Sequence, residues 1–146
     1  MKKEMTTSDH GIEMIKKHES LRLNSYLCPA GVPTIGYGHT SGVNLNERIT
    51  IEQADDFLRS DIKTTENAVN SYQLDLTQNQ FDAIVSFVYN VGVPNFKSST
   101  LLKRLKENTR HPDIHQQFMR WVFGGGKRLS GLYNRRVQEW LLFNKQ

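Results

Sequence analysis

The 146-residue sequence contains only one cysteine, Cys28, and no long apolar run. A single cysteine excludes an internal disulfide framework and a cysteine-rich zinc site, and it is typical of a protein made in a reducing compartment. No run approaches the roughly 18 apolar residues of a membrane-spanning helix, so we expect no stable membrane insertion. The opening MKKEMTTSDHG has two lysines without an apolar stretch behind them, and we therefore expect no Sec-type signal peptide.

The chain carries little excess charge. Its net charge of +4 is compatible with an ordinary solvated surface or with an anionic partner. The sequence has no zinc-finger spacing, no aromatic RNA-binding signature and no basic heptad helix, so we expect no nucleic-acid partner. An anionic polymer such as a bacterial wall fits the charge equally well.

Hydrophobic spacing divides the chain into a β-containing segment and several helices. Residues 8–18 have helical spacing. Residues 21–49 alternate apolar residues with glycines and prolines, which is typical of short strands joined by tight turns. Residues 50–72 form one long helix, and residues 77–146 contain further helices. We predict a single α+β, mostly helical domain over residues 1–146, with a small β-containing lobe, a connecting helix and a larger all-helical lobe.

Local signals mark several helix boundaries. Residues 50–53 and 77–80 are capping boxes, in which a threonine hydroxyl and a glutamine amide each satisfy a backbone amide. The glycine triplet at 124–126 interrupts the chain, and a last helix starts at Ser130. Four residues of this last helix are predicted to face the core: Tyr133, Val137, Trp140 and Leu141.

Glu19 is a candidate proton donor. Cleavage of a glycosidic bond needs a proton donor at the leaving oxygen and a second group that handles water or the developing positive charge. Glu19 directly follows the first predicted helix and precedes the β-containing segment, so we expect it at a junction between lobes, where clefts form. Taken alone, a glutamate at a helix end is more often a surface residue.

Cys28 and Thr34 follow Glu19 at intervals of nine and six residues, inside the stretch YLCPAGVPTIGYGHT. This arrangement resembles the phage-type lysozymes (endolysins) of glycoside hydrolase family 24, whose pattern is Glu, eight residues, Asp or Cys, five residues, then Thr. The segments SFVYNVG at 86–92 and GGGK at 124–127, followed by GLYNRR at 131–136 and Glu139, are also similar to motifs of that family. The resemblance covers residues 8–143.

The resemblance implies a lysozyme-like fold with a cleft between the lobes. It also implies cleavage of the β-1,4 bond between N-acetylmuramic acid and N-acetylglucosamine in bacterial peptidoglycan, which lyses the host of a phage. Glu19 would be the general acid, and Cys28 and Thr34 would handle the water. Cys28 could act as a base, as a nucleophile or as a neutral group that holds water.

The resemblance also indicates substrate-binding candidates. Tyr89 and Asn90 fall where the helical lobe of the family faces the cleft, although an aromatic residue at helical spacing is more often part of the core. Asn134 and Arg135 suit N-acetyl groups and carboxylates respectively. His39 is a further candidate, for which a structural hydrogen bond is favoured over catalysis. For Arg136 and Glu139 we favour a structural ion pair.

Two apparent ligand motifs are rejected. His111 and His115 stand four residues apart but lack the glutamate of a zinc-protease motif, and Lys127 follows glycines without the order of a phosphate-binding loop. We therefore expect no metal and no cofactor. We expect a monomer that stays in the host cytoplasm until release through a separately made membrane pore, and then acts on the cell wall in the periplasm.

Three other functions remain open. A lytic transglycosylase would need only Glu19 as its acid and would form an anhydro product. A peptidase acting on wall peptides could pair Cys28 with His39, but it leaves Glu19 and Thr34 without a role. A non-catalytic wall-binding module would not need the spacing of Glu19, Cys28 and Thr34.

Overall fold

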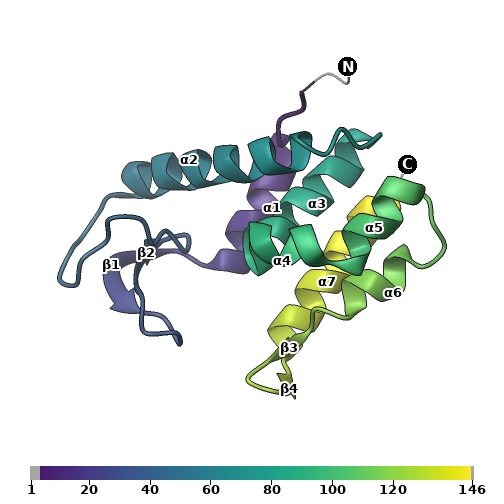
Figure 1. The fold of residues 1–146 in the computed structure, drawn as a ribbon. Coiled ribbons are helices and arrows are strands. Elements are labelled where there is room, and N and C mark those ends of the chain that lie inside the picture. Colours follow the sequence, from purple (N-terminus) through teal and green to yellow (C-terminus); the bar gives the residue numbers. More distant parts are fainter. Residues whose placement is uncertain (1–3, 146) are drawn as a thin grey trace.

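One long helix, α2 (Ile51–Asn70), joins two lobes in the computed structural model, which describes residues 4–145 (Figure 1). The helix starts at the predicted capping box, where the Thr50 hydroxyl accepts from the Gln53 amide at 3.1 Å and the Gln53 side chain accepts from the Thr50 amide at 2.9 Å. Its 20 residues span about 30 Å. One side of α2 therefore serves as a wall shared by both lobes.

The smaller lobe, here called the β lobe (residues 21–49), is built on an antiparallel pair of strands. Strand β1 (Arg22–Leu27) pairs with β2 (Pro33–Gly36), with Tyr26 opposite Thr34. After β2 the chain turns back, and Ile35 forms an isolated bridge with His39. A small apolar cluster supports these turns: Ile35, Ile49 and Ala54.

The helical lobe is packed around α3 (Gln78–Val91), which starts at the second predicted capping box. Residues 80–88 of α3 are all buried, because other helices cover it on several sides. The other helices of this lobe are α1 (Asp9–Glu19), α4 (Val93–Ser98), α5 (Thr100–Glu107), α6 (Ile114–Met119) and α7 (Ser130–Phe143). Phe87 of α3 makes edge-to-face contacts with Phe96, Phe118 and Trp121, and these rings form the centre of the core.

The sequence pattern predicted an all-helical larger lobe, but this lobe also contains two short strands. Strands β3 (Phe123–Gly124) and β4 (Lys127–Arg128) form a two-residue hairpin, which projects from the lobe in Figure 1. The turn between them consists of Gly125 and Gly126, with φ of +59° and +79°. Two consecutive residues in this left-handed region reverse the chain tightly, so the glycine triplet builds a hairpin as well as interrupting the helices.

The prediction of which residues of α7 face the core is partly wrong. Leu141 is 57% exposed, and Tyr133, Val137 and Trp140 are only half-buried. The fully buried face instead carries three charged residues together with two apolar ones: Arg135, Arg136, Glu139, Leu142 and Phe143. Burial of charges is tolerated here because Arg136 Nε lies 2.7 Å from Glu139 Oε1, and hydrophobic spacing alone gives no sign of such a pair.

The segment before α1 is held by side chains of α2 and α3. Asn70 forms two hydrogen bonds with the backbone of Met5, and the buried carboxylate of Glu66 accepts from the Thr7 amide. The Asp82 carboxylate accepts from both the amide and the hydroxyl of Ser8. Ser8 is also the N-cap of α1, as predicted, so these contacts fix the position of the helix that ends at Glu19.

Across residues 4–145, none of the helices combines the length and apolar character that crossing a bilayer requires.

Candidate active site

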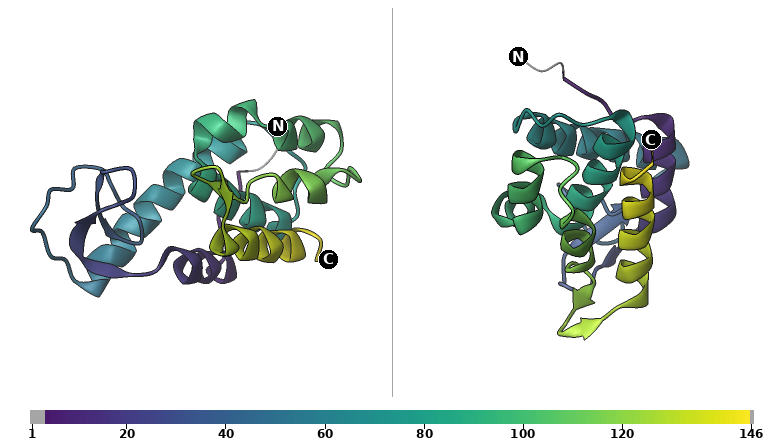
Figure 2. Two further views of the ribbon diagram at one scale, coloured as in Figure 1. Left: turned by 90° about the horizontal axis from the view of Figure 1, so that it is seen from below. Right: turned by 90° about the vertical axis from the view of Figure 1, so that its right-hand side faces the viewer.

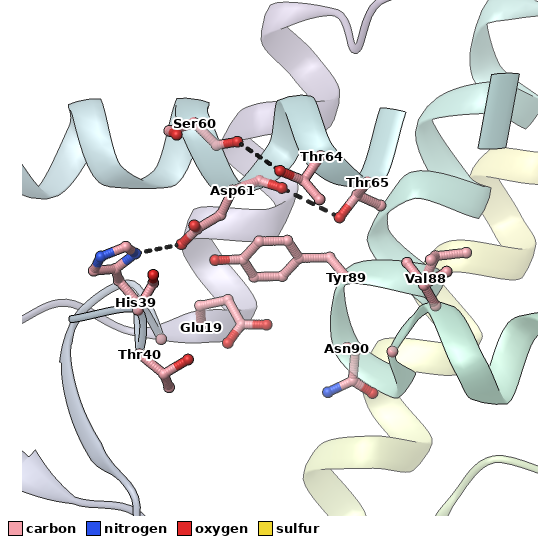
Figure 3. A pocket seen from close by; sticks show the side chains of 14 residues that line it. Glu19, His39, Thr40, Ser60, Asp61, Thr64, Thr65, Val88, Tyr89 and Asn90 are labelled. Atoms are coloured by element: carbon pink, nitrogen blue, oxygen red, sulfur yellow. Dashed lines mark hydrogen bonds and ion pairs between the residues drawn. The ribbon is translucent and has the colours of Figure 1, made fainter. Parts of the chain in front are cut away.

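An open cavity of about 670 Å³ lies where the end of α1, the β lobe, α2 and α3 meet (Figure 3). Its lining is rich in polar groups and includes two carboxylates, those of Glu19 and Asp61. Other labelled lining residues in Figure 3 are His39, Thr40, Ser60, Thr64, Thr65, Val88, Tyr89 and Asn90. The structure thus brings four of the predicted site residues to one cavity: Glu19, His39, Tyr89 and Asn90.

Glu19 is the last residue of α1. The helix ends because Ser20 adopts φ of +58°, and the Ser20 amide still donates to the Lys16 carbonyl at 3.2 Å. The Glu19 side chain is 17% exposed, so its carboxylate is largely enclosed but accessible from the cavity. The sequence analysis expected Glu19 at a junction between lobes, and α1 ends at such a junction.

Arg135 holds the carboxylate of Glu19 from the protein side. Its Nη1 donates to Glu19 Oε2 at 2.5 Å, its Nε donates to Glu139 Oε2 at 3.2 Å, and its Nη2 donates to the Ser86 carbonyl at 3.1 Å. With 5% of its side chain exposed, Arg135 does not line the cavity. Arg135, which the sequence analysis selected as a substrate-binding candidate, therefore contacts the candidate acid.

A buried network lies behind Arg135. Glu139 has no exposed side-chain surface, and it accepts from the Ser86 hydroxyl at 2.6 Å and from Arg136 Nη2 at 3.1 Å. Burial raises the pKa of Glu139 and lowers that of Arg136, while the attraction between the two charges opposes both shifts. The ion pair expected from the sequence is present, and Glu139 contacts Arg135 as well as Arg136.

His39 is held by two residues of α2. Its Nδ1 lies 2.8 Å from Asp61 Oδ2, and its ring stacks on Phe57 with a centroid distance of 4.2 Å and an interplanar angle of 3°. Asp61 was not among the residues selected from the sequence. The available signal was that Phe57 and Asp61 are four residues apart on one helix and so face the same side.

Tyr89 links α3 to the β lobe, because its hydroxyl donates to the Tyr37 carbonyl at 2.9 Å. Burial, followed by the negative charges of Glu19 and Asp61, raises the pKa of the Tyr89 phenol. Figure 3 shows the Tyr89 ring extending from α3 toward His39, between Asp61 and Glu19. Asn90 is exposed, so its amide is accessible to a ligand.

Cys28 and Thr34 contact each other but do not line the cavity that contains Glu19. Cys28 follows β1 in a turn, where its amide donates to the Val32 carbonyl at 3.0 Å. Hydrogen bonds from the backbone of Val32 and Ala30, with a smaller contribution from Thr34, lower the pKa of the Cys28 thiol. Asn134 is exposed on α7 and also lies outside the cavity lining.

The two histidines of the rejected motif, His111 and His115, have separate contacts in the described part of the chain. His111 Nδ1 accepts from the Asp113 amide at 3.0 Å, and the ring of His115 lies 5.0 Å from that of Trp140. Over residues 4–145, no group of three or more His, Cys, Asp or Glu side chains is arranged to hold a metal ion.

Comparison with known proteins gives the same answer from sequence and from structure. Residues 16–139 match the phage lysozyme family. An endolysin of Acyrthosiphon pisum secondary endosymbiont phage 1 is 44% identical over 95% of this chain and 98% of its own length. An endolysin of Bacillus phage PZA is 46% identical over 96% of this chain, but the match covers only 55% of that protein.

A solved structure, the muramidase domain of SpmX from Asticaccaulis excentricus, superposes with a TM-score of 0.88 and 37% identity. The match covers 97% of this chain and 99% of that domain. At 37% identity the two chains share sequence as well as the arrangement of their helices.

Proposed function

The chain belongs to the phage lysozyme family, and we propose on that premise that it is an endolysin N-acetylmuramidase. It hydrolyses the β-1,4 bond between N-acetylmuramic acid and N-acetylglucosamine in bacterial peptidoglycan, and so lyses the host cell. The observation that carries the proposal is the carboxylate of Glu19, held by a buried arginine at the edge of a polar cavity between two lobes.

Glu19 acts as the general acid. Arg135 occupies Oε2, whereas Oε1 faces Gly38, which itself lines the cavity. A proton on Oε1 is therefore the one that reaches the oxygen of the departing sugar. Once the proton has left, the guanidinium stabilises the carboxylate that remains.

Cys28 and Thr34 handle the water that attacks the sugar. The lowered pKa of the Cys28 thiol increases the fraction of thiolate, which accepts a hydrogen bond from water or takes its proton. Thr34 donates its hydroxyl to the Val32 carbonyl at 2.9 Å, which leaves its oxygen lone pairs to orient a neighbouring donor. Direct attack by water predicts inversion at the anomeric carbon.

The geometry gives no support to a cysteine peptidase. His39 is hydrogen-bonded to Asp61, and the hydrogen-bond partners of Cys28 lie in its own turn and at Thr34. No hydrogen bond joins Cys28 to His39 in the described part of the chain. The pair that a peptidase needs is therefore not assembled.

Mass spectrometry of purified peptidoglycan after digestion tests the function. A muramidase releases fragments with reducing muramyl ends. Anhydro-muramyl ends would establish a lytic transglycosylase, cleaved peptides would establish a peptidase, and an unchanged wall would leave only a binding module. Each of the last three results would overturn the proposal.

We further propose that the protein acts as a monomer without nucleic acid, and that it accumulates in the host cytoplasm before it reaches the wall. Its family and its modest net charge support this proposal. Light scattering after size exclusion measures the mass and any bound nucleic acid. Fractionation of expressing cells before and after membrane permeabilisation measures where the protein resides, and a membrane-bound pool before release would contradict the proposed location.

A further inference from the structure

A second cavity of about 300 Å³ lies between the start of α3, the loop before α6 and the end of α7. Figure 2 (left) shows the C-terminal end of α7 at the opposite end of the molecule from the β lobe. None of the residues lining this cavity lines the one that contains Glu19. Its volume is at the lower limit of pockets that bind small ligands.

The two cavities have opposite charge character. Two carboxylates and no lysine or arginine line the cavity of Glu19, whereas Arg110 and Lys145 line the second, which has no Asp or Glu in its lining. Neither Arg110 nor Lys145 forms a salt bridge within residues 4–145, although Arg104 on the neighbouring helix pairs with Glu107 and Asp113. Exposed cations at the rim of a cavity, with no salt bridge in the described residues, favour an anion.

The floor of the second cavity is apolar. Ile114 and Phe143 are 1% and 5% exposed, and Trp140 stacks on Phe143 with a centroid distance of 6.0 Å. An ion such as inorganic phosphate would leave this surface uncovered. The ligand that matches the cavity therefore carries an apolar group next to its negative charge.

The rim of the cavity also offers one group that recognises a peptide bond. The Gln80 side chain is not that group, because its Oε1 accepts from the Thr77 amide at 2.9 Å and its Nε2 donates to the Thr109 carbonyl at 3.4 Å. Asn144 is exposed, and its amide can pair with the amide of a ligand. Charge, apolar floor and this amide together match a short apolar peptide with a free carboxyl terminus.

We propose that this cavity binds the free carboxyl end of a short alanine-containing peptide, as found on the peptide stems of bacterial peptidoglycan. The assignment to wall peptides rests on the proposed function, whereas the peptide chemistry rests on the cavity alone. The site gives the enzyme a second contact with the wall at the end of the molecule away from the β lobe. Two linked contacts on one polymer raise the apparent affinity without any change at Glu19.

Binding is measured by NMR titration of the wild-type chain with N-acetyl-D-alanyl-D-alanine. We expect the indole signal of Trp140 to shift and that of Trp121, outside the cavity, to stay unchanged. The same dipeptide with an amidated carboxyl terminus should bind at least tenfold more weakly, because the charged partner of Arg110 and Lys145 is gone. Equal binding of the amide, or no shift of Trp140, would overturn the proposal.

Paired charge reversals test the site in the enzyme. Arg110→Glu combined with Lys145→Glu should weaken dipeptide binding at least tenfold. The matched control, Lys97→Glu with Lys103→Glu, has the same charge change on exposed residues outside the cavity and should alter binding less than twofold. Equal effects of the two pairs would show only a general effect of charge and would contradict the site.

Two substrates separate this proposal from the proposed function. The Arg110 and Lys145 double variant should digest intact peptidoglycan at least threefold more slowly at low substrate, yet digest glycan strands stripped of peptides at the wild-type rate. A wild-type protein that digests neither substrate but still binds the dipeptide would refute the muramidase and leave the peptide site. Full activity of the double variant on intact peptidoglycan would refute the role of the site at the wall.

Discussion

Gly38 lies directly against the carboxylate of Glu19. A Cβ atom at position 38 would be 3.0 Å from Glu19 Oε1, and the backbone of Gly38 has φ of +84°. Position 38 therefore requires glycine for two separate reasons, one of backbone conformation and one of space beside the candidate acid.

Gly38→Ala should impair activity by more than its effect on stability. The methyl group crowds Oε1 and moves the carboxylate, so we expect at least a tenfold loss of kcat together with a lower Tm. Gly42→Ala is the matched control, because Gly42 has φ of +71° and nothing within 4 Å of its Cβ position. It should lower the free energy of unfolding by a similar amount, about 1–2 kcal/mol of backbone strain, with little change in kcat. Equal kcat for the two variants would contradict the close contact.

Glu19→Gln should abolish lysis without unfolding the protein. Glutamine is nearly isosteric but cannot donate the proton, and loss of general acid catalysis costs on the order of 10²–10⁴-fold in rate. The matched control is Glu13→Gln on the same helix, whose side chain is 72% exposed. Turbidity loss of a wall suspension gives the rate, and circular dichroism checks the fold. Activity of Glu19→Gln within threefold of the wild type would refute its role.

Cys28→Asp should retain substantial activity, whereas Cys28→Ala should be severely impaired. A carboxylate can hold water or accept its proton, and a methyl group can do neither. Early-time NMR of the product gives its anomeric configuration, which we expect to be inverted. Retention of configuration, or a trapped glycosyl-cysteine, would show that the thiolate is a nucleophile, while the muramidase activity itself would stand.

His18 should make the folded state less stable in mild acid. Burial, followed by the positive charges of Arg135, Lys17 and Arg136, lowers the pKa of His18 from 6.5 to about 4. Between these two values the unfolded chain binds a proton that the folded chain does not, so stability falls as the pH drops from 6.5 toward 4.

Because His18 is half-buried, we expect a loss of about 1 kcal/mol, or about 2–4 °C in Tm. His18→Gln should flatten the dependence of Tm on pH between 7 and 5. The exposed His10 on the same helix provides the control, since His10→Gln should keep the wild-type slope. Identical slopes for all three proteins would rule out His18 as the titrating group.

Glu139→Gln should be strongly destabilising. The change leaves Arg136 buried without its ion-pair partner, and breaking a buried pair on one side costs about 3–5 kcal/mol. Urea unfolding measures this cost, with Glu107→Gln as control, because Glu107 is 54% exposed where it pairs with Arg104. Similar urea midpoints for the two variants would mean that the buried network contributes little.

Features encoded by neighbouring residues were predictable from the sequence. The capping boxes at 50–53 and 77–80 and the Ser8 cap are present, because each depends on side chains within three residues of the helix start. The family was identified correctly from the spacing of Glu19, Cys28 and Thr34 and from two further motifs. The helix caps followed from residues close in sequence, and the family followed from the spacing and order of its motifs.

Features that depend on distant partners were not predictable. The orientation of α7 was partly mispredicted, because its buried face consists of charges that are paired with one another and with Glu19. Asp61 was missed because its role comes from His39, 22 residues earlier in the chain. The roles of all the predicted site residues stay predictions, and Cys28, Thr34 and Asn134 do not line the cavity of Glu19.

The hydrogen bond between Arg135 and Glu19 joins residues that are 116 positions apart in the chain. A ribosome synthesises the N-terminal part of a protein first, at about 5–20 residues per second, so Glu19 emerges seconds before its partner. During that interval the nascent chain holds the candidate acid without the guanidinium that contacts it. Assembly of the candidate site is thus delayed until α7 has left the exit tunnel, and an interrupted translation product ending before Arg135 lacks this contact.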